Sequence, residues 1–455
     1  MKRLVKNGKI VTPEKTFKGD ILIDDGIIKD IAPHIKSDAE VIDASGLFVL
    51  HGGVDVHTHL NLKLGDRQVG DGFYEGMRAA AFGGTTTIVD HPEGGPKGCS
   101  LHHQPDYYKK LLLSEAVIDY GIHGIFQRAD EDILNEIPEL ISKGVTSMKA
   151  YLTYDDMLTN SDIDKILNKM KHSGGITAFH AEDDTTIKYL RDKYGKEGKL
   201  APIYHAKSRP AESEALAIQN ILDIAGDAPV YIVHLSTRLG LEVIKKARLD
   251  GKTVYAETCP QYLLLDESYY EREDGIKYIM APPLRTKEDT DALWKAVING
   301  DIDVIATDHC SFSCADKIKF GQGDFRKVPG GAPGVETRLP LIFSEGVING
   351  RISINRFVEL VAEKPAQIMG MYPKKGCIKI GADADIVLWD AELTKTISVK
   401  ELHQKCDYTP YEGMEVTGWP RTVILKGEII VNKDELLIEK GFGEYINRNR
   451  KAIGA

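Results

Sequence analysis

The sequence predicts an α/β protein, a (β/α)8 TIM barrel with a smaller β-sandwich domain built from both chain ends. In the central part of the chain, eight short apolar runs alternate with amphipathic segments of helical periodicity, which is typical of parallel strands joined by helices. Near both ends, short runs of β-branched residues are separated by glycine-containing pairs, which indicates antiparallel strands. A length of 455 residues suits a barrel with an accessory domain.

These patterns divide the chain into four segments. Residues 1–50 are expected to form the first part of the sandwich, residues 51–374 the barrel and residues 375–440 the second part of the sandwich. Residues 441–455 are a charged tail that we expect to contact a neighbouring subunit.

The individual elements follow from periodicity and from turn chemistry. The eight runs expected as barrel strands are 54–57, 85–91, 117–126, 147–151, 176–180, 230–235, 253–258 and 304–307. Amphipathic segments between them predict helices at 71–82, 133–143, 162–172, 213–225 and 239–250. In the sandwich, tight turns are expected at Asn7-Gly8, Asp25-Gly26 and Lys426-Gly427.

Composition and charge exclude several classes of protein. With 58 Lys and Arg against 68 Asp and Glu, the formal net charge is −10, and no basic run is present, so neither nucleic acid nor an anionic membrane is an expected partner. The six cysteines show no disulfide framework, and no apolar run resembles a signal peptide or a membrane span. We therefore expect a soluble cytoplasmic protein.

Six residues that can bind metal follow the predicted strands. A single histidine on a strand is usually a hydrogen-bonded core residue. Here, however, the C-terminal strand ends of a parallel barrel meet at one mouth, so these side chains are expected to converge, and four imidazoles with a carboxylate suit a divalent transition metal such as zinc. The residues are His57 and His59 on the first strand, Lys149 on the fourth, His180 on the fifth, His234 on the sixth and Asp308 on the eighth.

Lys149 has two interpretations, which its position alone does not separate. An ammonium group would be repelled by metal ions, whereas a lysine that carries CO2 as a carbamate is an anionic ligand able to bridge two of them. Alternatively, Lys149 pairs with an acidic group at the mouth of the barrel.

The chain resembles the cyclic amidohydrolases of the hydantoinase and dihydropyrimidinase family from end to end, and is most similar to the bacterial D-phenylhydantoinase type. The set formed by the HxH pair, the lysine, two further histidines and the aspartate is highly specific for that family. The matching stretches are GGVDVHTH (52–59), GGTTT (83–87), KAYLTY (149–154), HAE (180–182), SRP (208–210), APPLR (281–285), TDHC (307–310) and GVETR (334–338).

The resemblance implies a binuclear site with a carboxylated Lys149 bridging two divalent metals, zinc or alternatively manganese. His57 and His59 would hold one metal with Asp308, and His180 and His234 the other. A hydroxide bridging the metals would attack the amide carbonyl of the substrate ring, with Asp308 as general base and then acid. Tyr154 would stabilise the oxyanion, the alternative being an aromatic residue that only packs at the rim. A homotetramer is also implied.

Two positions match backbone groups that hold the ring in this family, Ala281 and Gly330, where relatives often have Ser and Asn. The loop after the first strand, residues 60–68, matches the wall around the ring substituent and carries Arg67. A solvated loop is the favoured interpretation, while pairing of Arg67 with an anionic substituent is the alternative. His91 is expected as a wall of the pocket.

These observations predict a hydrolase that opens the cyclic amide of hydantoins or dihydropyrimidines to N-carbamoyl amino acids. Its substrate is thus a small cyclic ureide or amide. Allantoinase or dihydroorotase activity on the same scaffold is the main alternative, kept open by the polar loop after the first strand. A non-catalytic assembly protein is a further alternative, disfavoured because such relatives lose metal ligands and every ligand position is filled in this chain.

Overall fold

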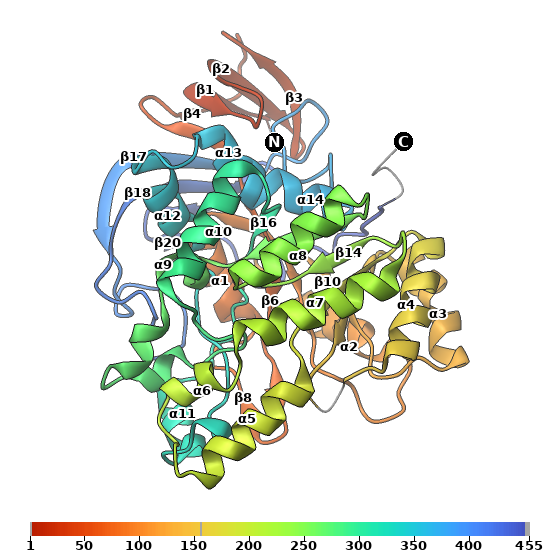
Figure 1. Cartoon of the computed structure of the whole chain (residues 1–455). Helices are drawn as coiled ribbons and strands as arrows, with labels where there is room; N and C mark the ends of the chain where they lie inside the picture. Colours follow the sequence, from red (N-terminus) through yellow and green to blue (C-terminus); the bar gives the residue numbers. More distant parts are fainter. Residues whose placement is uncertain (1, 155–156, 451–455) are drawn as a thin grey trace.

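Nine parallel strand segments form the barrel in the computed structural model, which describes residues 2–154 and 157–450 (Figure 1). They belong to two sheets, β10-β9-β6 and β11-β12-β13-β14-β15-β16. The segments are β6 (Gly53–Thr58), β9 (Thr85–Asp90), β10 (Asp119–Ile122), β11 (Gly124–Ile125), β12 (Ser147–Tyr151), β13 (Ile176–His180), β14 (Val230–Ile232), β15 (Val254–Thr258) and β16 (Val304–Ile305).

The third expected strand, 117–126, is divided into β10 and β11 at His123. β10 pairs with β9, whereas β11 pairs with β12. The segment that contains β10 and β11 therefore connects the two sheets of the barrel. The buried imidazole of His123 takes part in this crossing, because Nε2 lies 3.0 Å from the carbonyl oxygen of Val56 and Nδ1 lies 2.7 Å from Ser147 Oγ. A single continuous run was therefore the wrong expectation for this strand.

The first and last strands of the barrel are joined by backbone and side-chain contacts. Thr58 and His309 form a parallel bridge, and the amide of His59 donates to the carbonyl of His309 at 2.8 Å. The buried guanidinium of Arg338 donates to a carbonyl of each strand, Val54 O at 3.1 Å and Ile305 O at 3.0 Å. The strand ends that carry the predicted ligands are thereby brought to one mouth.

The helices surround the barrel (Figure 1), and local sequence signals explain their ends. In α4, Thr159 and Asp162 form a reciprocal capping box at the start and Gly174, in the left-handed conformation, ends the helix. The α-helices are α1 (Phe73–Phe82), α2 (His103–Glu115), α3 (Glu131–Ser142), α4 (Asn160–Ser173), α5 (Asp184–Lys196), α6 (Ile203–Lys207), α7 (Ala211–Ala225), α8 (Arg238–Leu249), α9 (Pro260–Leu264), α10 (Lys287–Asn299), α11 (Cys314–Gly321), α12 (Arg338–Ile342), α13 (Ile354–Val358) and α14 (Lys364–Met369).

Short helical turns occur late in the chain. They comprise the 3-10 helices η1 (Glu267–Glu271), η2 (Gly275–Tyr278) and η3 (Phe325–Lys327) and the π-helical segments η4 (Phe343–Ile348) and η5 (Glu359–Glu363). None of the helices in the described parts of the chain is long and apolar enough to cross a membrane.

The two chain ends build the β-sandwich together. Its strands follow the order β20-β19-β18-β17-β5-β1-β2-β3, with β4 also paired to β1. β5 is the junction, because it pairs in parallel with β1 and antiparallel with β17. The strands are β1 (Lys2–Val11), β2 (Thr16–Asp24), β3 (Ile27–Ala32), β4 (Glu40–Asp43), β5 (Phe48–His51), β17 (Ile386–Thr396), β18 (Glu415–Leu425), β19 (Glu428–Asn432) and β20 (Glu435–Leu436).

Two of the three predicted turns connect strands. Asp25-Gly26 joins β2 to β3 and Lys426-Gly427 joins β18 to β19, with positive φ at all four residues as such two-residue turns require. Asn7-Gly8, in contrast, lies within β1, where the register shifts between Val5 and Gly8. A side chain at Gly8 would meet Val49, since a Cβ there would lie 2.3 Å from Val49 Cγ2. The pair therefore forms a β-bulge within β1, and Val49 packs against it.

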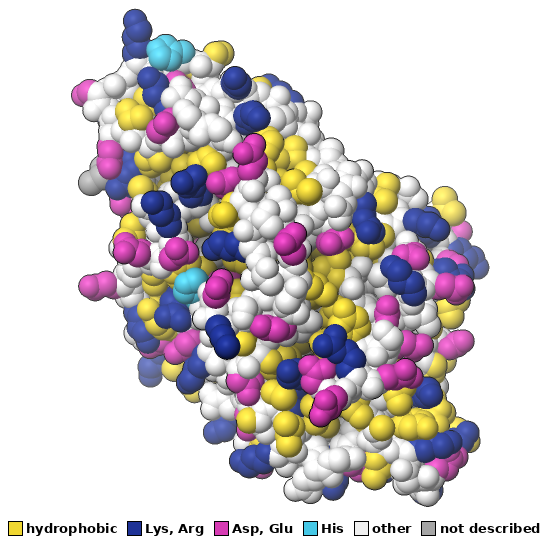
Figure 2. Space-filling model, turned by 90° about the vertical axis from the view of Figure 1, so that its left-hand side faces the viewer, with side chains coloured by type: hydrophobic (Ala, Val, Ile, Leu, Met, Phe, Trp, Pro, Cys, Tyr) yellow, Lys and Arg dark blue, Asp and Glu magenta, His cyan; other side chains and the backbone are white. Residues whose placement is uncertain are grey.

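The described part of the tail packs on the barrel of its own chain. Arg448 is buried and donates to Gly144 O at 3.1 Å, Ser147 Oγ at 2.7 Å and Ile122 O at 2.6 Å. The contact with a neighbouring subunit was predicted for residues 441–455 and stays a prediction; residues 451–455 of this tail lie outside the described residues. On the face shown in Figure 2, acidic and basic side chains are interspersed and no large patch of one sign forms.

Candidate metal centre

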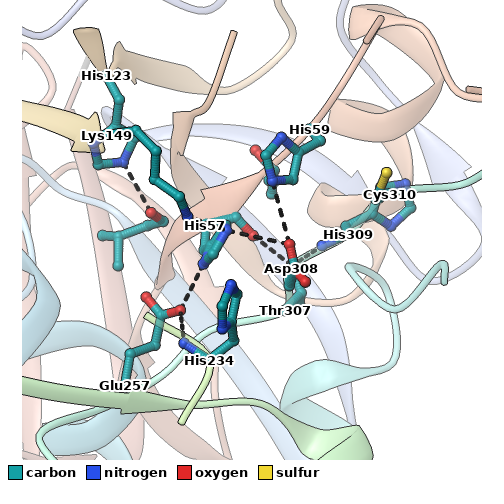
Figure 3. Close-up of polar contacts among 12 residues, drawn as sticks. His57, His59, His123, Lys149, His234, Glu257, Thr307, Asp308, His309 and Cys310 are labelled. Carbon is teal, nitrogen blue, oxygen red and sulfur yellow. Dashed lines mark hydrogen bonds and ion pairs between the residues drawn. The ribbon is translucent and has the colours of Figure 1, made fainter. Parts of the chain in front are cut away.

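Three of the predicted ligands form a compact cluster at the mouth of the barrel. His57 is one of the last two residues of β6, His59 directly follows that strand, and Asp308 follows β16. Asp308 Oδ1 lies 3.2 Å from His57 Nε2 and 3.3 Å from His59 Nε2, and one ligand atom from each residue lies within 4.8 Å of the others (Figure 3). Two imidazoles and a carboxylate at this spacing are a ligand set for a divalent transition metal.

Glu257, at the end of β15, fixes the orientation of two of the ligands. Its Oε1 lies 2.6 Å from His57 Nδ1 and accepts a hydrogen bond from the backbone amide of His234 at 3.0 Å. Its other oxygen accepts from the hydroxyl of Tyr231 at 2.7 Å. Because Nδ1 of His57 is held by this carboxylate, Nε2 is the ring nitrogen that would face a metal on the side of Asp308.

His180 and His234 stand beside this cluster. Their rings are 4.6 Å apart between centroids, and the ring of His234 is 5.4 Å from that of His57. His180 Nε2 lies 2.8 Å from Glu182, which also pairs with the guanidinium of Arg209. The contact to Glu182 leaves Nδ1 of His180 as the nitrogen available to a metal.

Lys149 reaches the same place from the end of β12. It is buried, with 2% of its surface exposed, and its Nζ lies 3.4 Å from His57 Nε2 (Figure 3). Burial lowers the pKa of Lys149 to about 8. Among the described residues no carboxylate forms an ion pair with it, so the paired lysine that the sequence left open has no partner there.

The side chains present fit a metal. Nδ1 of His59 and Nδ1 of His234 are buried and have no hydrogen-bond partner within the described residues. Burial also lowers the pKa of His234 far below its ordinary value, which leaves its imidazole neutral, the form that binds metals. Burial raises the pKa of Asp308, but the charge of His57 and hydrogen bonds from His57 and His59 outweigh it and hold that pKa well below its usual range.

Three site residues adopt a backbone conformation that is rare for residues with a side chain. The φ angles are 39° at His234, 52° at Asp308 and 75° at Tyr154. Such conformations cost on the order of 1 kcal/mol or more and persist where the surrounding structure imposes them, often at functional sites. Here they occur where the chain leaves the barrel strands.

The ligands open into a cavity of about 770 Å³, which Tyr154, Ala281, Gly330 and Arg67 all line. The ring of Tyr154 lies 5.2 Å from that of His180. Desolvation raises the pKa of Tyr154 to about 12, against the lowering influence of Arg209, so its hydroxyl keeps its proton at neutral pH.

Two expectations about the cavity wall need correction. The loop after the first strand is not merely solvated, because β7 (Lys63–Leu64) and β8 (Arg67–Gln68) form a small hairpin whose Arg67 is half-buried and lines the cavity. His91 is not a wall of the cavity. It lies behind His57, with ring centroids 4.5 Å apart, and stacks on His123 at 3.7 Å.

Sequence reasoning gave no role to the residues that orient the ligands. Glu182 could have been found, since it stands two positions after His180 and therefore on the same side of the chain. Glu257 is separated from His57 by 200 residues, so its contact depends on the closed barrel.

Comparison with known proteins agrees with this geometry. Residues 48–430 match the model of the amidohydrolase family, and the chain belongs to that family. D-phenylhydantoinase of Escherichia coli O1:K1 / APEC is 45% identical, with 98% of each chain covered. The crystal structure of dihydropyrimidinase from Brevibacillus agri NCHU1002 superimposes with a TM-score of 0.97 at 40% identity, covering 99% of each chain. L-hydantoinase (dihydropyrimidinase) from Arthrobacter aurescens gives 0.91 at 31% identity, covering 98% of this chain and 99% of the other.

Proposed function

We propose that this protein hydrolyses the ring amide of hydantoins or dihydropyrimidines and releases N-carbamoyl amino acids. The observation that carries the proposal is the cluster of His57, His59 and Asp308 at the floor of a cavity of about 770 Å³, in a chain similar to hydantoinases over its whole length. A cavity of this size accommodates a small heterocycle with a substituent.

Two divalent metal ions complete the proposed site, zinc by preference and manganese as the alternative. His57 and His59 would hold one ion and His180 and His234 the other, with a carboxylated Lys149 between them and Asp308 on the first. Such ions lower the pKa of bound water and polarise a carbonyl group. The position of Lys149 beside His57, without a carboxylate partner in the described chain, supports its modification by CO2.

The protein side chains supply proton transfer and orientation. Asp308, which is ionised at neutral pH, would accept the proton of the attacking water and later deliver it to the ring nitrogen that leaves. Tyr154 would donate a hydrogen bond from its protonated hydroxyl to the oxygen that becomes negative. Backbone groups of Ala281 and Gly330 would hold the amide edge of the ring.

Parallel assays of five cyclic substrates test the proposal. Purified protein loaded with zinc or manganese in the presence of bicarbonate is given hydantoin, phenylhydantoin, dihydrouracil, allantoin and dihydroorotate. We expect turnover of at least one of the first three. Turnover of allantoin or dihydroorotate alone would refute the assignment. Because relatives named for both D- and L-hydantoinase share the fold, the enantiomers of phenylhydantoin should be assayed separately.

Allantoinase or dihydroorotase activity is the second candidate, favoured by the presence of Arg67 in the cavity wall. A non-catalytic assembly role is disfavoured because all six ligand positions are filled. Metal analysis separates it from an enzyme, since a protein without bound metal and without activity after zinc, manganese and bicarbonate are added would support that role.

We also propose a homotetramer, by resemblance to the family. Light scattering of the purified protein measures its mass directly, and a monomer of 50.3 kDa would contradict the proposal.

A further inference from the structure

Basic groups outside the metal centre outnumber acidic ones in the wall of the cavity. Beyond Lys149, five cationic side chains border the cavity: Arg67, Lys188, Arg191, Arg209 and Arg326. The acidic residues of the lining are Glu93, Asp184 and Asp308. A neutral cyclic amide carries no negative charge with which these basic side chains could form an ion pair.

Most of these charges are already compensated. Arg209 pairs with Glu182, Lys188 lies 2.7 Å from Asp184, and Arg326 lies 2.6 Å from Asp324. Of the acids, Asp308 belongs to the metal centre, Asp184 is the partner of Lys188, and Glu93 accepts a hydrogen bond from the hydroxyl of Tyr108.

Arg67 and Arg191 remain without a carboxylate partner in the described chain. Both are half-buried and both are braced by aromatic rings on one segment: the guanidinium of Arg67 lies 5.2 Å from the ring centroid of Phe320, and that of Arg191 lies 5.7 Å from Phe325. Arg191 also donates to the carbonyl of Arg326 at 2.7 Å. The two arginines are thus held in place at the cavity by α11, η3 and the loop between them.

Half-buried arginines without a counter-ion leave donor groups that an incoming anion satisfies. Arginine also matches the planar geometry of a carboxylate better than lysine does. Neither arginine belongs to the ligand set, and both are half-buried and line the cavity into which the ligands open. A negative charge placed there would sit on an arm of the substrate and not on its ring.

We propose that Arg67 and Arg191 form a subsite for a carboxylate carried on a side arm of the cyclic substrate. The preferred substrates are then ring-closed ureides with an acidic substituent, in contrast to purely aromatic or aliphatic ones. This inference rests on the proposed function, because it concerns the substituent of the ring that the metal centre opens.

A pair of nearly isosteric substrates tests the subsite. The 5-(2-carboxyethyl) and 5-(2-carbamoylethyl) hydantoins differ in charge and hardly in shape, so the ratio of their kcat/KM values isolates the charge. We expect the metal-loaded enzyme to favour the carboxylate compound by about tenfold or more, the effect of one or two charge-assisted hydrogen bonds. High salt should reduce the ratio, since the subsite is partly open to solvent.

Three variants locate the effect. Arg67→Gln and Arg191→Gln should each reduce the ratio, and the double variant should bring it close to one. Arg421→Gln is the matched control, because Arg421 lies on β18, pairs with Asp390 and does not line the cavity. It should leave both rates and their ratio as in the parent enzyme.

Three outcomes would contradict the subsite: equal kcat/KM values for the two compounds, a preference for the carbamoyl compound, or a double variant that keeps the preference for the carboxylate compound. None of them would contradict the proposed ring-opening activity. If the enzyme opens neither of these two hydantoins and none of the five cyclic substrates named above, the proposed function is refuted. The subsite would then be refuted with it.

Discussion

Glu257 contacts two of the proposed metal ligands without being one itself. Its carboxylate is completely buried and is shared by the ring of His57, the backbone of His234 and the hydroxyl of Tyr231. A buried carboxylate with three partners fixes ring orientation and makes the imidazole a better donor to a cation. Metal affinity should therefore depend on this residue even though it lies behind the ligands.

Glu257→Gln should weaken metal binding by about tenfold or more, the usual effect of losing such a partner. Activity should fall at low zinc and recover as zinc is raised. Titration of apo-protein with zinc measures the shift. Glu242→Gln, an exposed residue of α8 paired with Arg238, is the control and should bind as the parent does. An unchanged zinc affinity in Glu257→Gln would show that His57 is oriented without it.

Lys149→Ala should abolish nearly all activity and lower the metal content, because the proposed bridge between the ions is lost. Elemental analysis of the purified variant together with a hydantoin assay measures both effects. Addition of a short carboxylic acid, which can occupy the vacated space, should restore part of the activity. A Lys149→Ala variant with full activity would disprove the bridging role.

At the scale of elements, α11 supports the wall of the cavity through one buried lysine. Lys317 Nζ donates to the carbonyl oxygen of Ile279 at 2.6 Å and to that of Pro329 at 3.1 Å. These carbonyls belong to the two segments that carry Ala281 and Gly330, the proposed contacts of the substrate ring. The lysine thus joins a helix to two loops and sets the distance between the backbone groups that would hold the ring.

Lys317→Met should raise KM about fivefold with a smaller change in kcat, because two buried carbonyls lose a donor worth about 1 kcal/mol. Steady-state kinetics with the best hydantoin substrate separates the two parameters. Lys319→Met, an exposed residue of the same helix, is the control. If Lys317→Met lowers thermal stability but leaves KM unchanged, the lysine only stabilises the fold.

At the scale of the whole molecule, one buried cation connects the barrel with the sandwich. Lys375 Nζ lies 2.6 Å from Asp119 at the start of β10, 2.9 Å from Asp383 and 2.7 Å from Asp385, which directly precedes β17. Burial raises the pKa values of Asp383 and Asp385, with Lys375 acting in the opposite direction. Three carboxylates around one ammonium group therefore depend on it for compensation.

Lys375→Met should reduce the free energy of unfolding by about 3–5 kcal/mol at pH 7, because buried carboxylates lose their counter-ion. The difference in free energy of unfolding between the parent protein and Lys375→Met should become smaller as the pH falls toward 4. A carboxyl group with a raised folded-state pKa stabilises the fold most below its unfolded pKa, about 4, and loses that contribution as pH rises.

Denaturant unfolding of Lys375→Met at pH 7 and pH 4.5 measures both values. Lys374→Met is the matched control, since Lys374 is exposed and lies 3.9 Å from Asp383, at the edge of ion-pair range. A deficit that stays constant with pH would contradict the role of the buried acids.

Local sequence patterns were sufficient to predict most of the strands and helices of the barrel. All eight predicted strands are present, the third as the two segments β10 and β11. The apolar face of α4 could be predicted from its periodicity, because burial on one side imposes a regular spacing of apolar residues. The incorrect predictions concern local conformations that are determined by residues distant in the sequence. Asn7-Gly8 is a bulge because Val49 packs over Gly8, and His91 stacks on His123 behind the metal centre instead of facing the cavity.

The sequence by itself determined the fold class and the positions of the proposed metal ligands, because strand periodicity and the shared direction of parallel strands place His57, His59 and Asp308 at one mouth. Only the tertiary structure decided which groups orient them and which charges border the cavity. Glu257 meets His57 across 200 residues, and Arg67 and Arg191 line one cavity although they are distant in the sequence, each beside an aromatic ring of the segment 320–325. Such contacts depend on how the closed barrel brings loops together, which no local pattern encodes.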